Sequence, residues 1–228
     1  MQKTDGVGGN NMSDKIKNAY KSSKNIYDDV MTQGSIFSKL YIKIFWSGTD
    51  DNEIAKKILS YIPDDFSGSL LDVPAGTAVF TEKKWAKLEK AAITCLDYSA
   101  DMLSQAKARL GKYGHIDFIQ GDVGDLPMSD ECFDTVLSMN GFHAFPDKEK
   151  AFSETFRVLK KGGEFIACFY ICGKSKITDW LVKNILSKRG WFTPPFQTED
   201  ELKEILNRYY SDININTDGS VVYFRCKK

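Results

Sequence analysis

The sequence has no excess of either charge, no long apolar run and only two histidines. Lysine and arginine together number 31, and so do aspartate and glutamate, which gives a formal net charge of zero. A nucleic-acid-binding protein normally carries a basic excess because phosphate contacts dominate its affinity, so we expect no nucleic-acid partner. No apolar run approaches the length of a membrane span and no secretory signal begins the chain. We therefore expect no membrane partner and a cytoplasmic location.

The cysteines are too few and too scattered for a disulfide framework. There are five, and an odd number cannot pair completely. Cys95 and Cys168 lie in apolar strand-like runs, where a reduced cysteine behaves as a small hydrophobic side chain. The pair Cys168 and Cys172 does not have CxxC spacing, and only His115 and His143 could join a metal site. We expect a reducing compartment and no bound metal ion.

The order of the sequence patterns predicts a single α/β domain. Residues 1–25 are rich in Gly, Asn, Lys and Ser, which predicts a flexible N-terminal tail followed by one domain over residues 26–228. From residue 69 onward strand-like runs alternate with helical ones, a pattern typical of a parallel sheet covered on both faces. The strands are predicted at 69–73, 92–97, 117–120, 135–139, 164–171, 213–216 and 221–225. The helices after the first strand are predicted at 77–88, 100–110, 148–160, 177–188 and 199–209, with Gly162-Gly163 as a C-cap.

Two details of this pattern predict how the sheet is completed. The last two strand-like runs are joined by Thr217-Asp218-Gly219, and Asp-Gly is a hairpin signal. We therefore predict a Rossmann-like, doubly wound, mostly parallel sheet of seven strands with an antiparallel C-terminal hairpin strand.

The segment from Leu70 to Ala78 predicts the position of a ligand site. Its apolar run ends on Asp72 and turns through Pro74 and Gly76, which places a carboxylate at the carboxyl end of a strand, where open α/β sheets bind ligands. A dinucleotide pyrophosphate needs closely spaced glycines, but this turn has one, and Pro74 offers no N–H donor. A cofactor without phosphates, such as S-adenosylmethionine, fits this turn better. The alternative is that Asp72 only caps the next helix.

Two further acids follow the next two strands. Asp97 can accept hydrogen bonds from ribose hydroxyls, a role it would also have in a nicotinamide site, or it can cap the helix at Ala100, which Ser99 could do instead. Asp122 can accept from an adenine amine with Val123 against the ring, or it can be an ordinary turn residue. Three acids on successive strand-helix units favour a nucleoside-type cofactor.

With these motifs the chain resembles the class I S-adenosylmethionine-dependent methyltransferases, in particular the quinone-biosynthesis and other small-molecule methyltransferases. The resemblance covers roughly residues 54–171 and is most specific in residues 121–127, 132–136 and 157–164. It implies S-adenosylmethionine as cofactor, S-adenosylhomocysteine as product, and cofactor contacts from Asp72, Val73, Pro74, Ala75, Gly76, Thr77, Asp97, Tyr98, Met102, Gly121, Asp122, Val123, Asn140 and Gly141. The chain departs from the family pattern at Pro74 and Ala78, where glycines are usual, and at Lys161, where proline is common.

The acceptor side is predicted from aromatic residues and one histidine. Segments 26–50 and 172–200 are expected to roof the acceptor pocket, and we predict substrate contacts from Tyr27, Tyr41, Trp46, Phe142 and Tyr170, each of which could instead belong to the ordinary core. His143 follows the fourth strand and is the one candidate general base, although a histidine at this position can also serve packing.

The sequence thus predicts a methyltransferase that acts on a small molecule by in-line displacement, as a monomer or homodimer. Methyl transfer from a sulfonium needs chiefly a well-placed acceptor, so a weak catalytic signature does not count against activity. Two alternatives stay open. One is a nicotinamide-dependent oxidoreductase, and the other is a non-catalytic protein that binds S-adenosylmethionine or S-adenosylhomocysteine.

Overall fold

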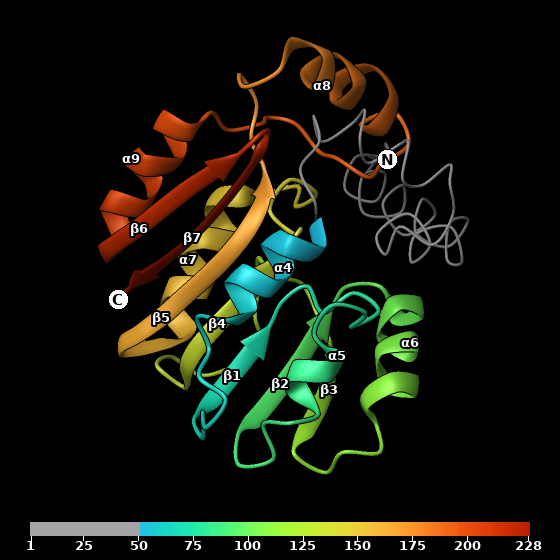
Figure 1. Cartoon of the computed structure of the whole chain (residues 1–228), viewed down its shortest axis with the longest axis vertical. Helices are drawn as coiled ribbons and strands as arrows, with labels where there is room; N and C mark the ends of the chain where they lie inside the picture. The colour runs from blue at the N-terminus through green and yellow to red at the C-terminus, as the bar shows by residue number, and fades with distance from the viewer. Residues whose placement is uncertain (1–50) are drawn as a thin grey trace, which may run out of the picture.

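A computed structural model describes residues 51–228, which form one seven-stranded sheet with helices on both faces (Figure 1). The predicted tail, the first roofing segment 26–50, and Tyr27, Tyr41 and Trp46 lie outside the described residues. The strands are β1 (Ser69–Asp72), β2 (Ala92–Asp97), β3 (Ile116–Gln120), β4 (Phe133–Met139), β5 (Leu159–Tyr170), β6 (Ser211–Asp218) and β7 (Val221–Lys227). The helices are α4 (Asp51–Leu59), α5 (Glu82–Trp85), α6 (Ala100–Leu110), α7 (Lys148–Val158), α8 (Lys176–Leu181), the π-helical turn η1 (Val182–Leu186) and α9 (Glu199–Tyr209).

The strand order is β3-β2-β1-β4-β5-β7-β6, which confirms the predicted fold class. Strands β1 to β5 are parallel, whereas β7 pairs antiparallel with both β5 and β6. The direction of chain travel across the sheet reverses between β1 and β4. Ligands of open α/β sheets bind in the crevice at such a switch point, beyond the carboxyl ends of the strands.

Two hydrophobic clusters cover the two faces of the sheet. One face packs against α4, α5 and α6 and includes the fully buried Ile58, Trp85 and Leu110. The other packs against α7 and α9 through a group of phenylalanine rings, among them Phe152 and Phe165. Figure 1 shows α4 and α5 in front of the sheet and α7 behind it. The strands are buried on both sides, which explains why β1, β4 and β5 read as apolar runs rather than alternating ones.

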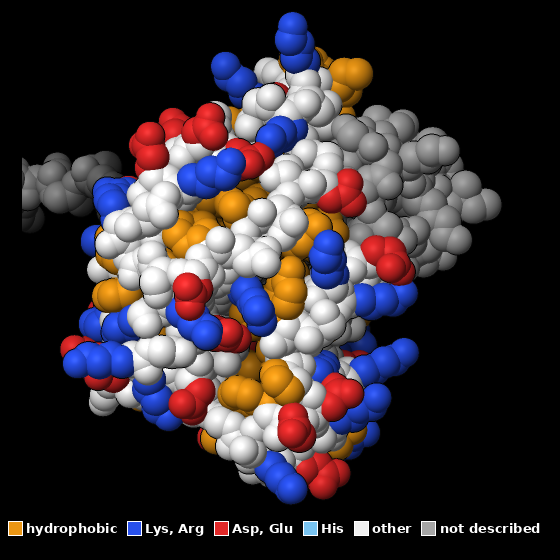
Figure 2. All heavy atoms as spheres, turned by 60° about the vertical axis from the view of Figure 1, so that its left-hand side comes forward, with side chains coloured by type: hydrophobic (Ala, Val, Ile, Leu, Met, Phe, Trp, Pro, Cys, Tyr) orange, Lys and Arg blue, Asp and Glu red, His pale blue; other side chains and the backbone are white. Residues whose placement is uncertain are grey.

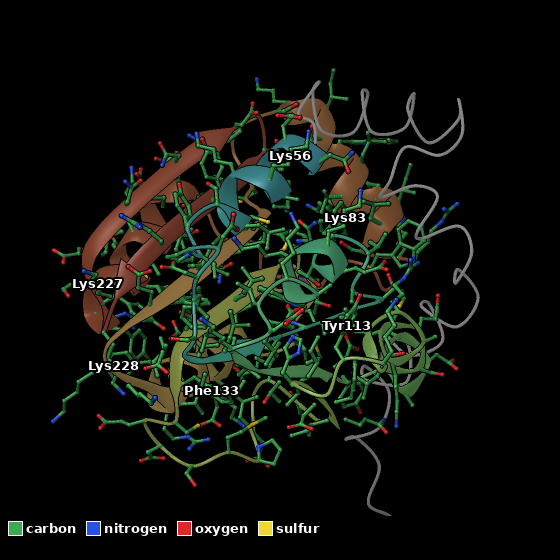
Figure 3. The ribbon with its side chains drawn as sticks, turned by 60° about the horizontal axis from the view of Figure 1, so that its bottom comes forward. Lys56, Lys83, Tyr113, Phe133, Lys227 and Lys228 are labelled. Carbon is green, nitrogen blue, oxygen red and sulfur yellow. The ribbon has the colours of Figure 1, made fainter. Side chains whose placement is uncertain are left out.

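At the amino ends of β1, β4 and β5, opposite the pocket, Asp134 joins Ser69 and Lys160 in a group of hydrogen bonds. The Asp134 carboxylate accepts hydrogen bonds from the Ser69 N–H, the Ser69 hydroxyl and the Lys160 ammonium, each at 2.8 Å. These bonds hold the pKa of Asp134 below its usual value against the opposing effect of burial. Figure 3 views the molecule from this side, where Phe133 begins β4 and Lys228 lies beside the start of β5.

Two predicted elements differ from the structure. The helix predicted at 77–88 is reduced to α5, and the segment before it is a loop in which Ala78 has a φ of 58°. Gly162-Gly163 does not cap α7, which ends at Val158, but lies inside β5. There β5 inserts extra residues between its pairings Phe133–Leu159 and Thr135–Glu164, and Gly162, with a φ of 76°, provides the bulge.

Candidate cofactor site

A hollow of about 1080 Å³, part of it open to solvent, lies at the carboxyl ends of β1, β2 and β4. Thirteen of the fourteen predicted cofactor residues line it, and Gly141 is the exception. The wall also contains residues that the sequence analysis did not select: Ala78, Val79, Phe80, Thr81, Leu96, Met139, Ala144, Phe145 and Pro146. Most of these are apolar and lie on the two loops after β1 and β4, so they carry no chemical signature of their own.

Asp72 lies at the floor of this hollow and is 1% exposed. Its Oδ2 accepts a hydrogen bond of 2.8 Å from the indole N–H of Trp85, which the packing of α5 against the sheet brings to that position. Burial raises the pKa of Asp72 to about 7, with a smaller contribution from the nearby charge of Asp97. A carboxylate in this position would be strongly stabilised by a positively charged ligand group.

Asp97 fixes the geometry of the turn after β1. Its Oδ2 accepts from the Gly76 N–H and its Oδ1 from the Ser99 N–H, both at 2.8 Å. Burial raises the pKa of Asp97 to about 6 against the opposing effect of these two bonds. Ser99 caps α6 through its own hydroxyl, which accepts from the Met102 N–H. Asp97 is therefore not needed as the helix cap, and its remaining lone pairs can accept from a ligand.

Asp122 and Asn140 lie at the rim. The Asp122 carboxylate accepts a hydrogen bond of 2.8 Å from the Gly124 N–H and is exposed, so it forms a tight turn beside the hollow while keeping a second oxygen available. Asn140 has a φ of 55°, a left-handed conformation that asparagine tolerates better than most residues. This conformation occurs where the chain leaves β4, and the residue forms part of the pocket wall.

Two observations of the structure test whether the hollow fits a ligand such as S-adenosylmethionine. A Cβ atom added to Gly76, whose φ is 55°, would meet no atom within 4 Å, so the turn presents bare backbone to the hollow. The buried hydroxyl of Thr81, also in the pocket wall, lies beside the Asp72 carboxylate and opposes the rise in its pKa that burial causes. A cavity with two buried acids, a buried hydroxyl beside one of them and exposed backbone fits the ammonium, sulfonium and ribose groups of this cofactor.

Within residues 51–228, four predicted site residues lie outside the wall of this hollow: Gly141, Phe142, Tyr170 and His143. The Phe142 ring is fully buried among Phe145, Phe152, Phe165 and Phe169, on the α7 face of the sheet. Gly141 is a contact point between loops, because a Cβ there would lie 2.8 Å from the Phe145 ring and closer still to Pro74. The Tyr170 hydroxyl donates a hydrogen bond of 2.6 Å to Asp179, which lies in the segment 172–200 that was expected to roof the acceptor pocket.

His143 lies in a packed and neutral environment. It is 7% exposed, its ring stacks on Phe192 with centroids 4.0 Å apart, and its Nδ1 accepts from the Tyr170 N–H at 3.3 Å. Burial, together with the nearby charge of Lys148, lowers the pKa of His143 to about 3. The residue is not part of the pocket wall. This geometry favours packing over proton transfer.

A pH-dependent unfolding measurement tests this environment. Between about pH 6.5 and pH 3 the unfolded chain binds a proton at His143 that the folded chain does not, so falling pH should lower the free energy of unfolding. His143→Phe keeps the stacking on Phe192 but cannot titrate. Between pH 6.5 and pH 5 the wild type should lose about 2 kcal/mol relative to this variant in urea unfolding.

His115 is present in both proteins, so its contribution cancels when the variant's free energy of unfolding is subtracted from that of the wild type. A wild-type-minus-variant difference that does not change with pH would contradict the buried, neutral state. A kinetic pKa near neutrality that disappears in the variant would restore His143 as a base.

Comparison with known proteins shows which family the residues around this hollow resemble. The family described as "Methyltransferase domain" matches residues 71–167, which run from the end of β1 into β5. Residues 71–167 of this chain match a methyltransferase domain. The match includes the acids after β1, β2 and β3, and it confirms the predicted family and, for the domain, the predicted cofactor.

Individual relatives give the same assignment. The ubiquinone/menaquinone biosynthesis C-methyltransferase of Bartonella henselae is 37% identical over 108 residues, which are 46% of this chain and 42% of that protein. The chain thus spans less than half the length of this relative. Among solved structures, an S-adenosylmethionine-dependent methyltransferase of Thermotoga maritima superposes with a TM-score of 0.67 at 18% identity, over 93% of this chain and 99% of that one.

A third comparison extends the similarity of fold. Phosphoethanolamine N-methyltransferase 2 of Haemonchus contortus, solved with S-adenosylmethionine, superposes with a TM-score of 0.72 at 16% identity, over 97% of this chain and 60% of that one. At such identities the structural matches show a shared fold. None of these relatives supports the nicotinamide-dependent oxidoreductase alternative.

Proposed function

We propose that this chain transfers the methyl group of S-adenosylmethionine to a small, apolar acceptor of the quinol type. One observation carries the proposal. Asp72, Asp97 and Asp122 line one hollow at the switch point of the sheet, within the residues that match a methyltransferase domain. The quinone class is suggested by the Bartonella relative, whose name places it in ubiquinone and menaquinone biosynthesis. We also propose that the protein acts in the cytoplasm, as a monomer or homodimer.

The residues of the hollow have distinct parts in this reaction. The cofactor supplies an electrophilic methyl group on a sulfonium, and the protein supplies binding and orientation. Asp72 and Thr81 hold the ammonium end, Asp97 holds the ribose and fixes the Gly76 turn, and Asp122 with Val123 holds the adenine. The apolar wall formed by Met139, Ala144 and Phe145 excludes water and faces the acceptor.

Thermal unfolding with candidate ligands tests the cofactor. S-adenosylmethionine or S-adenosylhomocysteine at about 100 times its dissociation constant should raise the free energy of unfolding by roughly 2.7 kcal/mol. For a chain of this size that corresponds to about 5–11 °C, at roughly 2–4 °C per kcal/mol. NADH should produce no shift. Asp97→Ala should lose the shift, whereas Asp117→Ala, a change at an exposed acid on β3, should keep it.

Either of two outcomes would overturn the proposal. A shift with NADH alone would restore the oxidoreductase. A shift with the adenosyl ligands, but no transfer of labelled methyl to any hydroquinone, phenol or amine acceptor, would leave the non-catalytic binding protein.

A further inference from the structure

The large hydrophobic side chains that are exposed among residues 51–228 gather on one segment, α8 with η1. Ile177 is 69% exposed, Trp180 is 59% exposed and Ile185 is 37% exposed. A lone exposed apolar residue needs no explanation, but three on eleven consecutive residues form a patch. Figure 1 places α8 at the top of the molecule, and Figure 2 shows orange and blue side chains next to each other at that height.

The opposite side of the same segment is anchored in the domain. Thr178, Val182 and Leu186 recur every fourth residue and are at most 2% exposed. Ser175 caps α8 by accepting from the Thr178 N–H. Because the buried stripe fixes the rotation of the helix, Ile177 and Trp180 point outward as a consequence of packing and not of a frayed end.

The charged side chains that residues 176–189 expose are all of one sign. Lys176, Lys183, Lys188 and Arg189 are exposed, and the three lysines make no ion pair with any described residue. The one acid of the segment, Asp179, faces inward, where it accepts from the Tyr170 hydroxyl and the Gly173 N–H. The segment therefore exposes basic and apolar side chains together, and its one acid is turned away from them.

We propose that α8 and η1 form a docking surface for an anionic lipid bilayer, with the segment lying in the plane of the membrane interface. A basic amphipathic segment that exposes tryptophan and isoleucine is suited to this position, because the apolar side chains enter the headgroup boundary while the lysines contact anionic headgroups. The mode of binding is peripheral, and no helix within residues 51–228 is long and apolar enough to cross a membrane. This proposal departs from the expectation of no membrane partner.

The position of the patch is also informative. α8 follows the carboxyl end of β5, and the carboxyl ends of β1, β2 and β4 form the cofactor hollow at the same edge of the sheet. Docking through α8 would turn this edge toward the bilayer. An apolar acceptor dissolved in the membrane would then have a short path to the protein.

Co-sedimentation with lipid vesicles tests the proposal with the full chain. The wild type should bind vesicles that contain phosphatidylglycerol much more tightly than vesicles of phosphatidylcholine alone. Added salt should weaken the binding because it screens the lysines. Trp180 fluorescence should shift to shorter wavelength on binding, and this shift should be absent in Trp180→Phe.

Two variants and a matched control separate the contributions. Lys176→Glu with Lys183→Glu should lower the partition constant about tenfold or more, and Ile177→Ser with Trp180→Ser should abolish binding. Lys90→Glu with Lys161→Glu makes the same charge change at exposed sites beside the opposite edge of the sheet and should bind as the wild type does. Cofactor-induced thermal shifts should be equal in all four proteins, which shows that they are folded.

Three results would overturn the proposal: equal binding to both kinds of vesicle, equal binding of the two patch variants and the control, or a wild-type dimer that the Ile177 and Trp180 changes convert to monomer. The last result would assign the patch to a second copy of the chain. A failure of this experiment would leave the thermal shift with S-adenosylmethionine intact, so it does not bear on the proposed function.

Discussion

Replacing Asp72 with Asn is expected to abolish S-adenosylmethionine binding and at the same time to stabilise the ligand-free protein above pH 7. The reason is that a fully buried carboxylate with a pKa of about 7 is costly to ionise. Its pKa in the unfolded chain lies near 3.8, so the folded state binds more protons between about pH 4 and pH 7 and its stability falls as pH rises through that window. The variant should not show this decline and should gain about 2 kcal/mol at pH 8, measured by urea unfolding.

A second acid of opposite character serves as the control. The pKa of Asp134 is lowered by its partners Lys160 and Ser69, so Asp134→Asn should destabilise the protein at neutral pH and leave cofactor binding unchanged. Asp72→Asn should still accept the Trp85 N–H, which limits the loss of structure. If Asp72→Asn binds the cofactor as tightly as the wild type, Asp72 is only a partner of Trp85. If it destabilises the protein at pH 8, burying the ionised Asp72 carboxylate costs less than its raised pKa implies.

The second large effect is expected from two glycines, Gly76 in the pocket wall and Gly141 outside it. Alanine should chiefly lower cofactor affinity at Gly76 and chiefly lower stability at Gly141. Gly141→Ala should cost about 3 kcal/mol or more in the free energy of unfolding, because its Cβ would overlap Pro74 and lie 2.9 Å from Ser138 Oγ. Gly76→Ala places its Cβ in open space and should cost only about 1–2 kcal/mol, from its φ of 55°. That Cβ would enter the cofactor hollow, so affinity should fall about tenfold or more, equivalent to about 1.4 kcal/mol.

Gly114→Ala is the matched control, since a Cβ there meets nothing within 4 Å and the backbone is not left-handed. Its stability should remain within about 0.5 kcal/mol of the wild type. Calorimetric titration of the three variants separates the two losses. An affinity loss in Gly114→Ala, or none in Gly76→Ala, would contradict the assignment of the hollow.

Elements with a complete local signal were predicted well from the sequence. β2 at 92–97, α6 at 100–110 and α9 at 199–209 have the predicted bounds, because each combines a capping residue or a terminal acid with an unbroken apolar period. The helix at 77–88 was wrong although Thr77, Thr81 and Trp85 are buried at helical spacing. The backbone before Thr81 is a loop in which Ala78 has a φ of 58°, so only Glu82–Trp85 are helical. Val79 and Phe80 in that loop line the hollow, and no local signal distinguishes a pocket wall from a helix.

The residues of the candidate site also differ in whether the sequence could reveal their positions. Acids at strand ends could be predicted because topology alone brings the ends of parallel strands to one edge. The positions of Phe142, His143 and Tyr170 depend on partners far away in sequence, such as Phe165, Phe192 and Asp179. These contacts form only when α7 and the segment after β5 pack on the sheet, so the spacing of residues could not reveal them.

The reduction of the expected helix to the four residues of α5 has an electrostatic consequence. A full helix starting at Thr77 would aim the positive end of a macrodipole at the pocket, which favours phosphates and disfavours cations. A four-residue helix has only a small part of that dipole, so the field in the hollow is set by Asp72 and Asp97. The loop after β1 thereby favours positively charged ligands over negatively charged ones. It provides no strong positive field to bind a pyrophosphate, whereas the two acids attract a sulfonium.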